Sequence, residues 1–165
     1  MTTLQELLDA SIARAGEYLR RSFRMPQHSL NAAQLTNHLE GEPITIALAT
    51  VTSKGEPRVA PVGAIFHAGR FAVPILRTAA RVKHVRRNPA VSLSLDEDND
   101  FAVIVHGKAR VVQDGDEFDA LVARQRATGE GGTVLSWGPR EEVAFLVVDP
   151  DVMFTFARYP DRFPS

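Results

Sequence analysis

Three β-rich segments follow one another between residues 44 and 76, and the turns between them are too short to hold a helix. The segments Ile44–Thr52, Pro57–Phe66 and Arg70–Leu76 are rich in β-branched and apolar residues. Ser53–Glu56 and His67–Gly69 form the turns. Parallel strands need a crossover connection of about a dozen residues or more, so the three segments are predicted to form an antiparallel meander.

More strands and two helices are predicted on the C-terminal side of this meander. The expected strands are Ala90–Leu95, Phe101–Val112, Val143–Val148 and Val152–Ala157, and the expected helices are Thr78–Arg87 and Asp114–Thr128. Six or seven short strands with a few helices indicate a mainly β protein with a closed or split β-barrel and peripheral helices.

The N-terminal part of the chain has helical periodicity instead. Apolar residues recur at three- and four-residue steps from Leu4 to Phe23, and Thr3 and Glu6 have the spacing of a capping box. A short second helix is predicted after Asn31. With 165 residues, the chain is expected to form one domain, residues 1–165, with an amphipathic helix in 1–24 and the barrel in 44–158.

Composition excludes several kinds of site and of protein. The chain has no cysteine, which rules out disulfides, thiolate zinc sites and a cysteine nucleophile, and fits a reducing cytoplasm. The formal net charge of −1 argues against a polyanion binder that works by overall charge. The start is not a secretory signal, and Phe101–Val105 and Val143–Val148 are too short to span a membrane. We therefore predict a cytoplasmic protein that does not bind membranes.

Basic residues gather in the middle of the chain. Between residues 54 and 95 there are eight basic residues and one acidic residue, Glu56. A helix that opens near Thr78 and carries Arg81 in its first turn presents free N–H groups and a cation, which together favour a phosphate. A solvated basic helix face is the alternative interpretation. Arg86 and Arg87, near the helix end, fit dipole partners or surface charge.

The order and spacing of several motifs resemble the FMN-binding split-barrel family that includes pyridoxamine 5′-phosphate oxidase. The motifs are Ser53–Pro57 with Arg58–Val62, then Arg81–Leu93 around Asn88-Pro89, and then His106–Val112. The resemblance implies a six-stranded antiparallel split β-barrel that forms a homodimer, with the flavin bound between the subunits. It also implies a set of cofactor-binding residues: Arg58, Val59, Ala60, Pro61 and Val62 along the flavin ring, and Ile75, Leu76, Arg77, Thr78, Arg81 and Lys83 at the phosphate end.

The chain departs from the oxidase pattern at the helix start. The oxidase usually has Ser-Arg-Lys there, whereas this chain has Ala79-Ala80-Arg81. The oxidase's substrate-binding C-terminal segment is matched only faintly, by Arg162–Pro164. These departures argue against pyridoxine or pyridoxamine phosphate as the substrate. The basic residues from Arg77 to Arg87 are more similar to those of relatives that use the deazaflavin coenzyme factor 420. The anionic tail of that coenzyme is longer and would need more cations to bind it.

Other candidate residues leave alternatives open. Trp137, in a glycine-rich loop, either covers the flavin of the partner subunit or fills the dimer interface. His106, in an apolar strand, is an interior or an interface residue, with a haem role as a minor alternative. No two of the five histidines have the i, i+4 spacing of a helical metal pair, so no metal site is predicted.

The function indicated is an oxidoreductase that uses FMN, or alternatively the deazaflavin coenzyme, to transfer hydride to or from a small organic substrate. The cofactor carries this chemistry, so the sequence need not show an acid–base pair. The first rival is a non-catalytic flavin-binding or flavin-storage protein of the same fold. The second is a nucleic-acid or regulatory module, which the near-zero net charge and the lack of aromatic residues in the basic helix disfavour.

Overall fold

The computed structural model describes residues 1–128 and 139–165. Within these residues, six strands form a closed antiparallel barrel in the order β1-β2-β3-β6-β5-β4. The strands are β1 (Ile44–Val51), β2 (Pro57–His67), β3 (Arg70–Leu76), β4 (Ala90–Glu97), β5 (Phe101–Val112) and β6 (Val143–Ala157). The mainly β, six-stranded barrel expected from the sequence is therefore confirmed.

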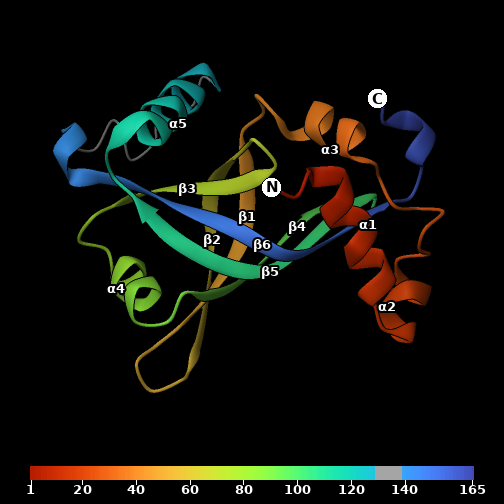
Figure 1. Ribbon diagram of the computed structural model, residues 1–165, viewed down its shortest axis with the longest axis horizontal. Helices are drawn as coiled ribbons and strands as arrows, with labels where there is room; N and C mark the ends of the chain where they lie inside the picture. The colour runs from red at the N-terminus through yellow and green to blue at the C-terminus, as the bar shows by residue number, and fades with distance from the viewer. Residues whose placement is uncertain (129–138) are drawn as a thin grey trace.

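The helices form two groups on opposite sides of the barrel in Figure 1. One group is α1 (Leu4–Arg14), α2 (Glu17–Ser22) and α3 (Ala32–Leu39), and the other is α4 (Ala80–Arg87) and α5 (Gly115–Ala127), of which α5 packs on the outer wall of the barrel. Two short 3₁₀ turns, Arg140–Glu142 and Pro160–Arg162, flank β6. In the described residues, none of the helices has the length and apolar character needed to cross a bilayer.

The N-terminal helix differs from the expectation. Thr3 and Glu6 form the predicted capping box, but α1 ends at Arg14, and Ala15 and Gly16 have extended backbone angles before α2 begins. The Arg20 guanidinium donates hydrogen bonds to the carbonyls of Ala15 and Ile12, at 3.0 and 2.6 Å, and so satisfies the end of α1. The prediction of a single helix is wrong because Gly16 interrupts the periodic pattern and the side chain of Arg20 caps the end of α1.

The last two predicted strands form one strand, β6. Their expected separation at Asp149-Pro150-Asp151 is wrong, because β6 continues through these residues with a bulge opposite His106 and Gly107 of β5. Proline lacks a ladder donor and is tolerated at such an irregularity. A Cβ on Gly107 would lie 2.2 Å from the Asp149 carbonyl oxygen, so the two backbones can approach this closely only at a glycine.

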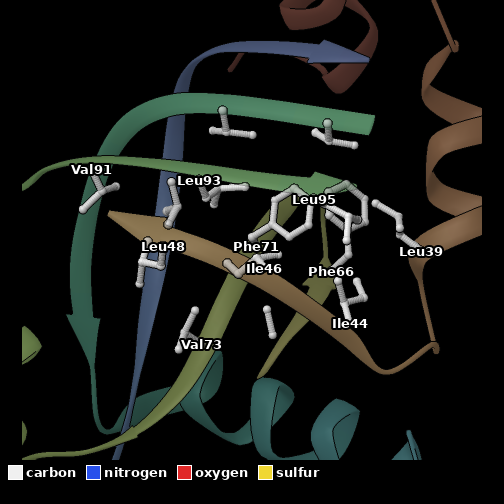
Figure 2. Packing of buried hydrophobic residues seen from close by; sticks show 14 of the residues in the cluster. Leu39, Ile44, Ile46, Leu48, Phe66, Phe71, Val73, Val91, Leu93 and Leu95 are labelled. Carbon is white, nitrogen blue, oxygen red and sulfur yellow. The ribbon is translucent and has the colours of Figure 1, made fainter. Parts of the chain in front are cut away.

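The barrel interior holds the main hydrophobic core. Ile46 and Leu48 of β1 lie beside Leu93 and Leu95 of β4, and Leu39 reaches in from α3 (Figure 2). α1 adds Leu8, and α4 adds Val82 and Val85. A second cluster lies outside the barrel, where Phe118, Leu121 and Val122 of α5 pack on Ile65, Ala72, Val112, Phe145 and Val147.

Candidate cofactor site

The predicted flavin-lining residues lie where β2 separates from β3. β2 pairs with β3 only from Ile65 to His67, whereas its first eight residues, Pro57–Ala64, pair with β1. On the other side, β3 pairs with β6 along Phe71–Leu76. In the described part of the chain, Pro57–Ala64 thus has a strand partner along one edge only, and the barrel is split between β2 and the end of β3.

The structure places most of the predicted residues on the two sides of this split. Arg58, Val59, Ala60, Pro61 and Val62 lie on the β2 side, and Ile75, Leu76 and Arg77 lie at the end of β3. The free edge of a strand presents N–H and C=O groups to whatever lies beside it. The split therefore offers backbone hydrogen bonds to a flat ligand with amide-like edges.

The side chains of the β2 segment alternate between the two faces of the sheet. Ala60 and Val62 lie opposite the buried Leu48 and Ile46, so they face the barrel interior. Val59 and Pro61 face outward, and Val59 is 71% exposed although it is apolar. Arg58 extends from the end of the strand and pairs with Glu56 at 2.8 Å. An exposed apolar wall of this kind is suited to a ligand or a partner.

The turn after β3 leads into the uncapped start of α4. The N-cap residue is Ala79, which offers no side-chain acceptor to the first N–H groups of the helix. The helix begins at Ala80, and the predicted start at Thr78 is wrong because the Ala79 N–H bonds the Leu76 carbonyl and places Thr78 in an exposed turn. The free N–H groups at this end favour an anion, as the sequence indicated.

The way α4 packs on the barrel places its basic side chains near the end of β1 and the start of β2. Val82 and Val85 are buried in the core, which leaves Arg81 half-buried and Lys83 exposed. His84 lies 3.2 Å, Nδ1 to Oγ1, from Thr50 of β1, and Thr50 is the register partner of Arg58. The structure therefore brings the start of β2, at Pro57, and the basic helix, which starts at Ala80, to the same end of the barrel.

Arg77 is engaged by the strands themselves. Its Nε donates to the Val143 carbonyl at 2.9 Å, and its Nη2 donates to the Gln113 carbonyl at 2.8 Å. These bonds tie the end of β3 to β6 and β5. Arg77 thus supports one side of the split, and Arg81 and Lys83 are the cations that remain beside the helix start.

A cleft of about 560 Å³ lies between α4 and the start of α5. Its lining includes Arg86, Arg110, Gln113, Asp114 and Glu117. Arg110 is paired there with Glu117 and Asp149, whereas the partner of Arg86 is the neutral side-chain amide of Gln113, at 3.4 Å from Nη2 to Oε1.

The charged cluster beside this cleft centres on Arg110, which the sequence reasoning did not single out. Arg110 donates to Glu117 at 2.6 and 2.8 Å and to Asp149 at 2.7 Å, and Arg70 donates to Asp149 at 2.7 Å. The hydrogen bonds from Arg110 lower the pKa of Glu117 below its ordinary value. Burial would raise the pKa of Asp149, but the bonds from Arg110 and Arg70 outweigh it and lower that pKa.

The remaining predictions about single residues have mixed outcomes. His106 points outward and is exposed, so the interior alternative is wrong. His67 and His84 are half-buried. Trp137 lies outside the described residues. Among the residues described, no three histidine, aspartate or glutamate side chains are grouped to hold a metal ion.

Comparison with known proteins assigns the chain to a family. The model of the family described as pyridoxamine 5′-phosphate oxidase matches residues 33–155, which include β1 to β5 and most of β6. The chain belongs to the pyridoxamine 5′-phosphate oxidase family. The match includes both sides of the split and the basic helix α4. No curated protein matches the chain.

Solved structures share the fold of this family member at low sequence identity. A conserved hypothetical protein from Mycobacterium tuberculosis aligns with a TM-score of 0.68 and 16% identity, over 85% of this chain and 92% of the other. An F420 reductase aligns at 0.57 and 19%, over 71% and 94%. A haem storage protein from Vibrio cholerae aligns at 0.60 and 18%, over 74% and 92%. At these identities the likeness establishes the barrel fold alone.

Proposed function

We propose that this protein binds FMN, or the deazaflavin coenzyme factor 420, in the split between β2 and β3 and works as an oxidoreductase on a small organic substrate. The bound ring would supply hydride transfer. The single observation that carries the proposal is the edge of Pro57–Ala64, which has no strand partner within residues 1–128 and 139–165, beside the uncapped start of α4. The strand edge suits the amide-like edge of a flavin, and the helix start suits its phosphate.

The residues at the split suit both the ring and the phosphate of such a cofactor. The β2 segment from Val59 to Val62 has small and apolar side chains, which allow a ring to lie close to the backbone. At the other end, the free N–H groups of α4 and the half-buried Arg81 would hold a phosphate. Arg77 would keep the end of β3 in place through its bonds to Val143 and Gln113. The protein thus contributes orientation and charge.

FMN and factor 420 are both candidate cofactors, and they would make different use of the cations Arg81 and Lys83 on α4. FMN carries one phosphate, which Arg81 and the helix start would satisfy. The factor 420 tail is longer and more anionic, and the exposed Lys83 would serve it. An F420 reductase shares the fold, which supports the second candidate in the same way as the family match supports the first.

We also propose that the working unit is a homodimer in which the cofactor is enclosed by the second subunit. Val59 and Pro61 form an exposed apolar wall next to the split that a single subunit leaves open. A second copy would cover this wall and complete the site. The cytoplasmic location expected from the sequence stays a prediction.

The test is cofactor titration of the purified protein and two matched variants. Arg81→Ala should weaken FMN or factor 420 binding by about 1.5–3 kcal/mol, the range for hydrogen bonds to charged groups. Arg87→Ala, in the exposed last turn of the same helix, should change binding little. A Lys83→Ala variant that affects factor 420 more than FMN would identify the deazaflavin coenzyme. Equal losses from Arg81→Ala and Arg87→Ala would mean a diffuse basic surface instead of a site.

A flavin-storage protein of the same fold is the second candidate. The haem storage protein with this fold favours it. Stopped-flow reduction of the bound cofactor by a nicotinamide donor separates the two. Turnover no faster than that of free flavin would favour storage. A bulky Ala60→Leu variant should depress turnover more than phosphate-end affinity, because Ala60 is part of the strand edge that would hold the ring, while Arg81 would still hold the tail.

A further inference from the structure

Two side chains of opposite charge, Arg86 and Asp114, line the cleft between α4 and the start of α5. Within residues 1–128 and 139–165, neither of them has an ion-pair partner within 4.0 Å. The Arg86 guanidinium contacts the neutral amide of Gln113 instead, at 3.4 Å from Nη2 to Oε1. The proposed cofactor site uses neither charge, so the pair of them needs another explanation.

Asp114 is the N-cap residue of α5, but its side chain does not cap the helix. An N-cap aspartate ordinarily accepts a hydrogen bond from a backbone N–H group of the first helical turn. The Asp114 side chain makes no such bond, and it is exposed at the cleft. Its carboxylate is therefore open to a molecule that enters the cleft.

The two charges reach the cleft from neighbouring positions. Gln113, which the Arg86 guanidinium contacts, directly precedes Asp114 in the chain. The Cα atoms of consecutive residues are about 3.8 Å apart, so the cation and the carboxylate meet the same small part of the cleft. A small molecule that carries both a positive and a negative charge would reach both side chains.

Arg110 and Glu117 hold one wall of the cleft in place. Arg110 donates to both carboxylate oxygens of Glu117, at 2.6 and 2.8 Å, and to Asp149 at 2.7 Å. A bidentate arginine–carboxylate pair has a fixed geometry, and these bonds join β5 to α5 and β6. Arg110 and Glu117 are thus occupied with each other, whereas Arg86 and Asp114 face the cleft with their charges uncompensated by an ion pair in the described residues.

The backbone of β5 adds a donor and an acceptor at the same place. The Ala109 N–H bonds the Pro89 carbonyl at 2.8 Å, so the backbone groups of Ala109 point away from β6. These directions repeat every second residue along an antiparallel strand, and the N–H and C=O of Val111 therefore point the same way. β4 pairs with β5 only as far as Lys108, so in the described part of the chain no strand covers Val111 on this edge. Val111 also lines the cleft.

We propose that this cleft binds a free α-amino acid with a small apolar side chain. A purely anionic ligand would meet Asp114 and Glu117, and a purely cationic one would meet Arg86 and Arg110, whereas an α-amino acid carries both charges. Its carboxylate would accept hydrogen bonds from Arg86 and the Val111 N–H. Its ammonium group would donate to Asp114 and the Val111 carbonyl.

The rest of the cleft suits a ligand of this class. Val85 and Ala109 lie in the lining beside Val111, and they offer apolar contact to a side chain such as that of valine. The volume of about 560 Å³ is ample for a small molecule. The proposal goes beyond the proposed function and does not depend on it, because it concerns none of the residues assigned to the cofactor.

Calorimetric titration of the full chain with L-valine tests the inference. The wild-type protein should bind L-valine with a dissociation constant below about 1 mM, the upper end of usual Michaelis constants. N-acetyl-L-valine lacks the ammonium group and L-valine amide lacks the carboxylate. Each should bind at least about fivefold more weakly than L-valine, because each loses one charged contact at an exposed position.

Two pairs of matched variants locate the site. Arg86→Gln and Asp114→Asn should each raise the dissociation constant for L-valine at least about fivefold. Arg87→Gln and Asp116→Asn alter exposed residues on the same two helices that do not line the cleft, and they should change it less than about twofold. All four positions are exposed, and circular dichroism should show the wild-type fold in each variant.

Each contrary result would overturn the inference. An absence of saturable L-valine binding below about 1 mM would mean that the cleft is a solvated surface. N-acetyl-L-valine or L-valine amide that binds as tightly as L-valine would show that the two charges are not recognised together. Binding that Arg86→Gln and Asp114→Asn leave unchanged would place the ligand elsewhere, and equal losses in Arg87→Gln and Asp116→Asn would indicate a diffuse effect of surface charge.

Discussion

Two outer faces of the same barrel are built from different side chains. Under α5, the outward residues of β3, β6 and the end of β5 include Phe145, Val147 and Val112, and the helix covers them with Phe118 and Leu121. A second face, which we call the open face, is formed by outward residues of β2, β1, β4 and β5. Most of these residues are small, such as Ala47, Ala49 and Ser92, and Val59 is 71% exposed. On both faces, outward residues alternate along the strands with residues that point into the packed interior of the barrel. This alternation therefore does not distinguish the two faces.

The difference shows which face the chain covers for itself. A large aromatic side chain pointing out of a barrel needs cover, and the chain supplies it with a helix of its own. A wall of alanine, proline and serine allows close approach by another backbone or by a flat ring. The size of the outward residues thus separates a surface used for stability from one left for binding.

The largest effect is expected from breaking the covered face. Phe118 is 1% exposed and packs edge-to-face on Phe145 with 5.8 Å between the ring centroids. Phe118→Ala should lower the free energy of unfolding by about 3–5 kcal/mol, the usual cost of removing a buried aromatic ring. Urea unfolding monitored by circular dichroism measures it. Val59→Ala is the matched control on the open face and should change the unfolding of the subunit little.

The border between the two faces should be the next most sensitive position. An alanine methyl at Gly107 would meet the carbonyl of Asp149 and the Cα of Pro150, which are backbone atoms that cannot rotate away. Gly107→Ala should cost about 1–3 kcal/mol, the range for overpacking. Alanine at Gly63, where nothing lies within 4 Å of the added atom, should be tolerated. Equal effects of the two substitutions on thermal unfolding would show that β5 and β6 do not approach as closely as described.

A charge on the open face should act on association and leave folding alone. Val59→Glu would bury a carboxylate in the proposed dimer contact, and we expect the dimer dissociation constant to rise at least about tenfold. Tyr18→Glu changes an equally exposed side chain on α2, 86% accessible, and should leave the dimer intact. Light scattering across a dilution series compares them. A dimer that tolerates Val59→Glu but not Tyr18→Glu would move the contact to the N-terminal helices.

The smallest effect is expected from the ion pairs on the covered side. The pKa values of Glu117 and Asp149 are lowered, so their contribution to stability is present above the ordinary values of 4.5 and 3.8 and is lost as the pH falls below them. The carboxylates are 42–47% exposed, so screening limits the whole effect to about 1 kcal/mol or less. Arg110→Met should flatten the fall in stability between about pH 5 and 3. A fall as steep in Arg110→Met as in the wild type would assign it to other carboxylates.

The barrel could be predicted from the sequence because its signals are local. Short turns at Ser53–Glu56 and His67–Gly69 determine the antiparallel meander, and the capping residues Thr3 and Asn31 begin helices where expected. The break between α1 and α2 at Ala15–Gly16 could not be predicted, because the carbonyl of Ala15 accepts a hydrogen bond from Arg20, which lies on the next helix. The continuity of β6 was missed because Pro150 resembles a turn residue unless the opposing glycine is known.

The candidate site could be predicted only in part, for a related reason. The basic helix and the β2 segment have local patterns, but the split between them depends on where β2 and β3 stop pairing. The cluster of Arg70, Arg110, Glu117 and Asp149 joins positions up to 79 residues apart, and no local spacing indicates such a cluster. The hydrogen bond between Ser92 and His106, 2.7 Å from Oγ to Nδ1, likewise depends on the register between β4 and β5.

Sedimentation velocity of the purified protein with FMN or factor 420, followed by the visible absorption of the cofactor, tests the central claim most directly. The account predicts that this absorption sediments with a dimer, at one cofactor per subunit, and that it returns to the free cofactor in Arg81→Ala but not in Arg87→Ala. Cofactor absorption that sediments with a monomer would contradict the shared site. A dimer that carries no FMN or factor 420 would contradict the proposed function itself.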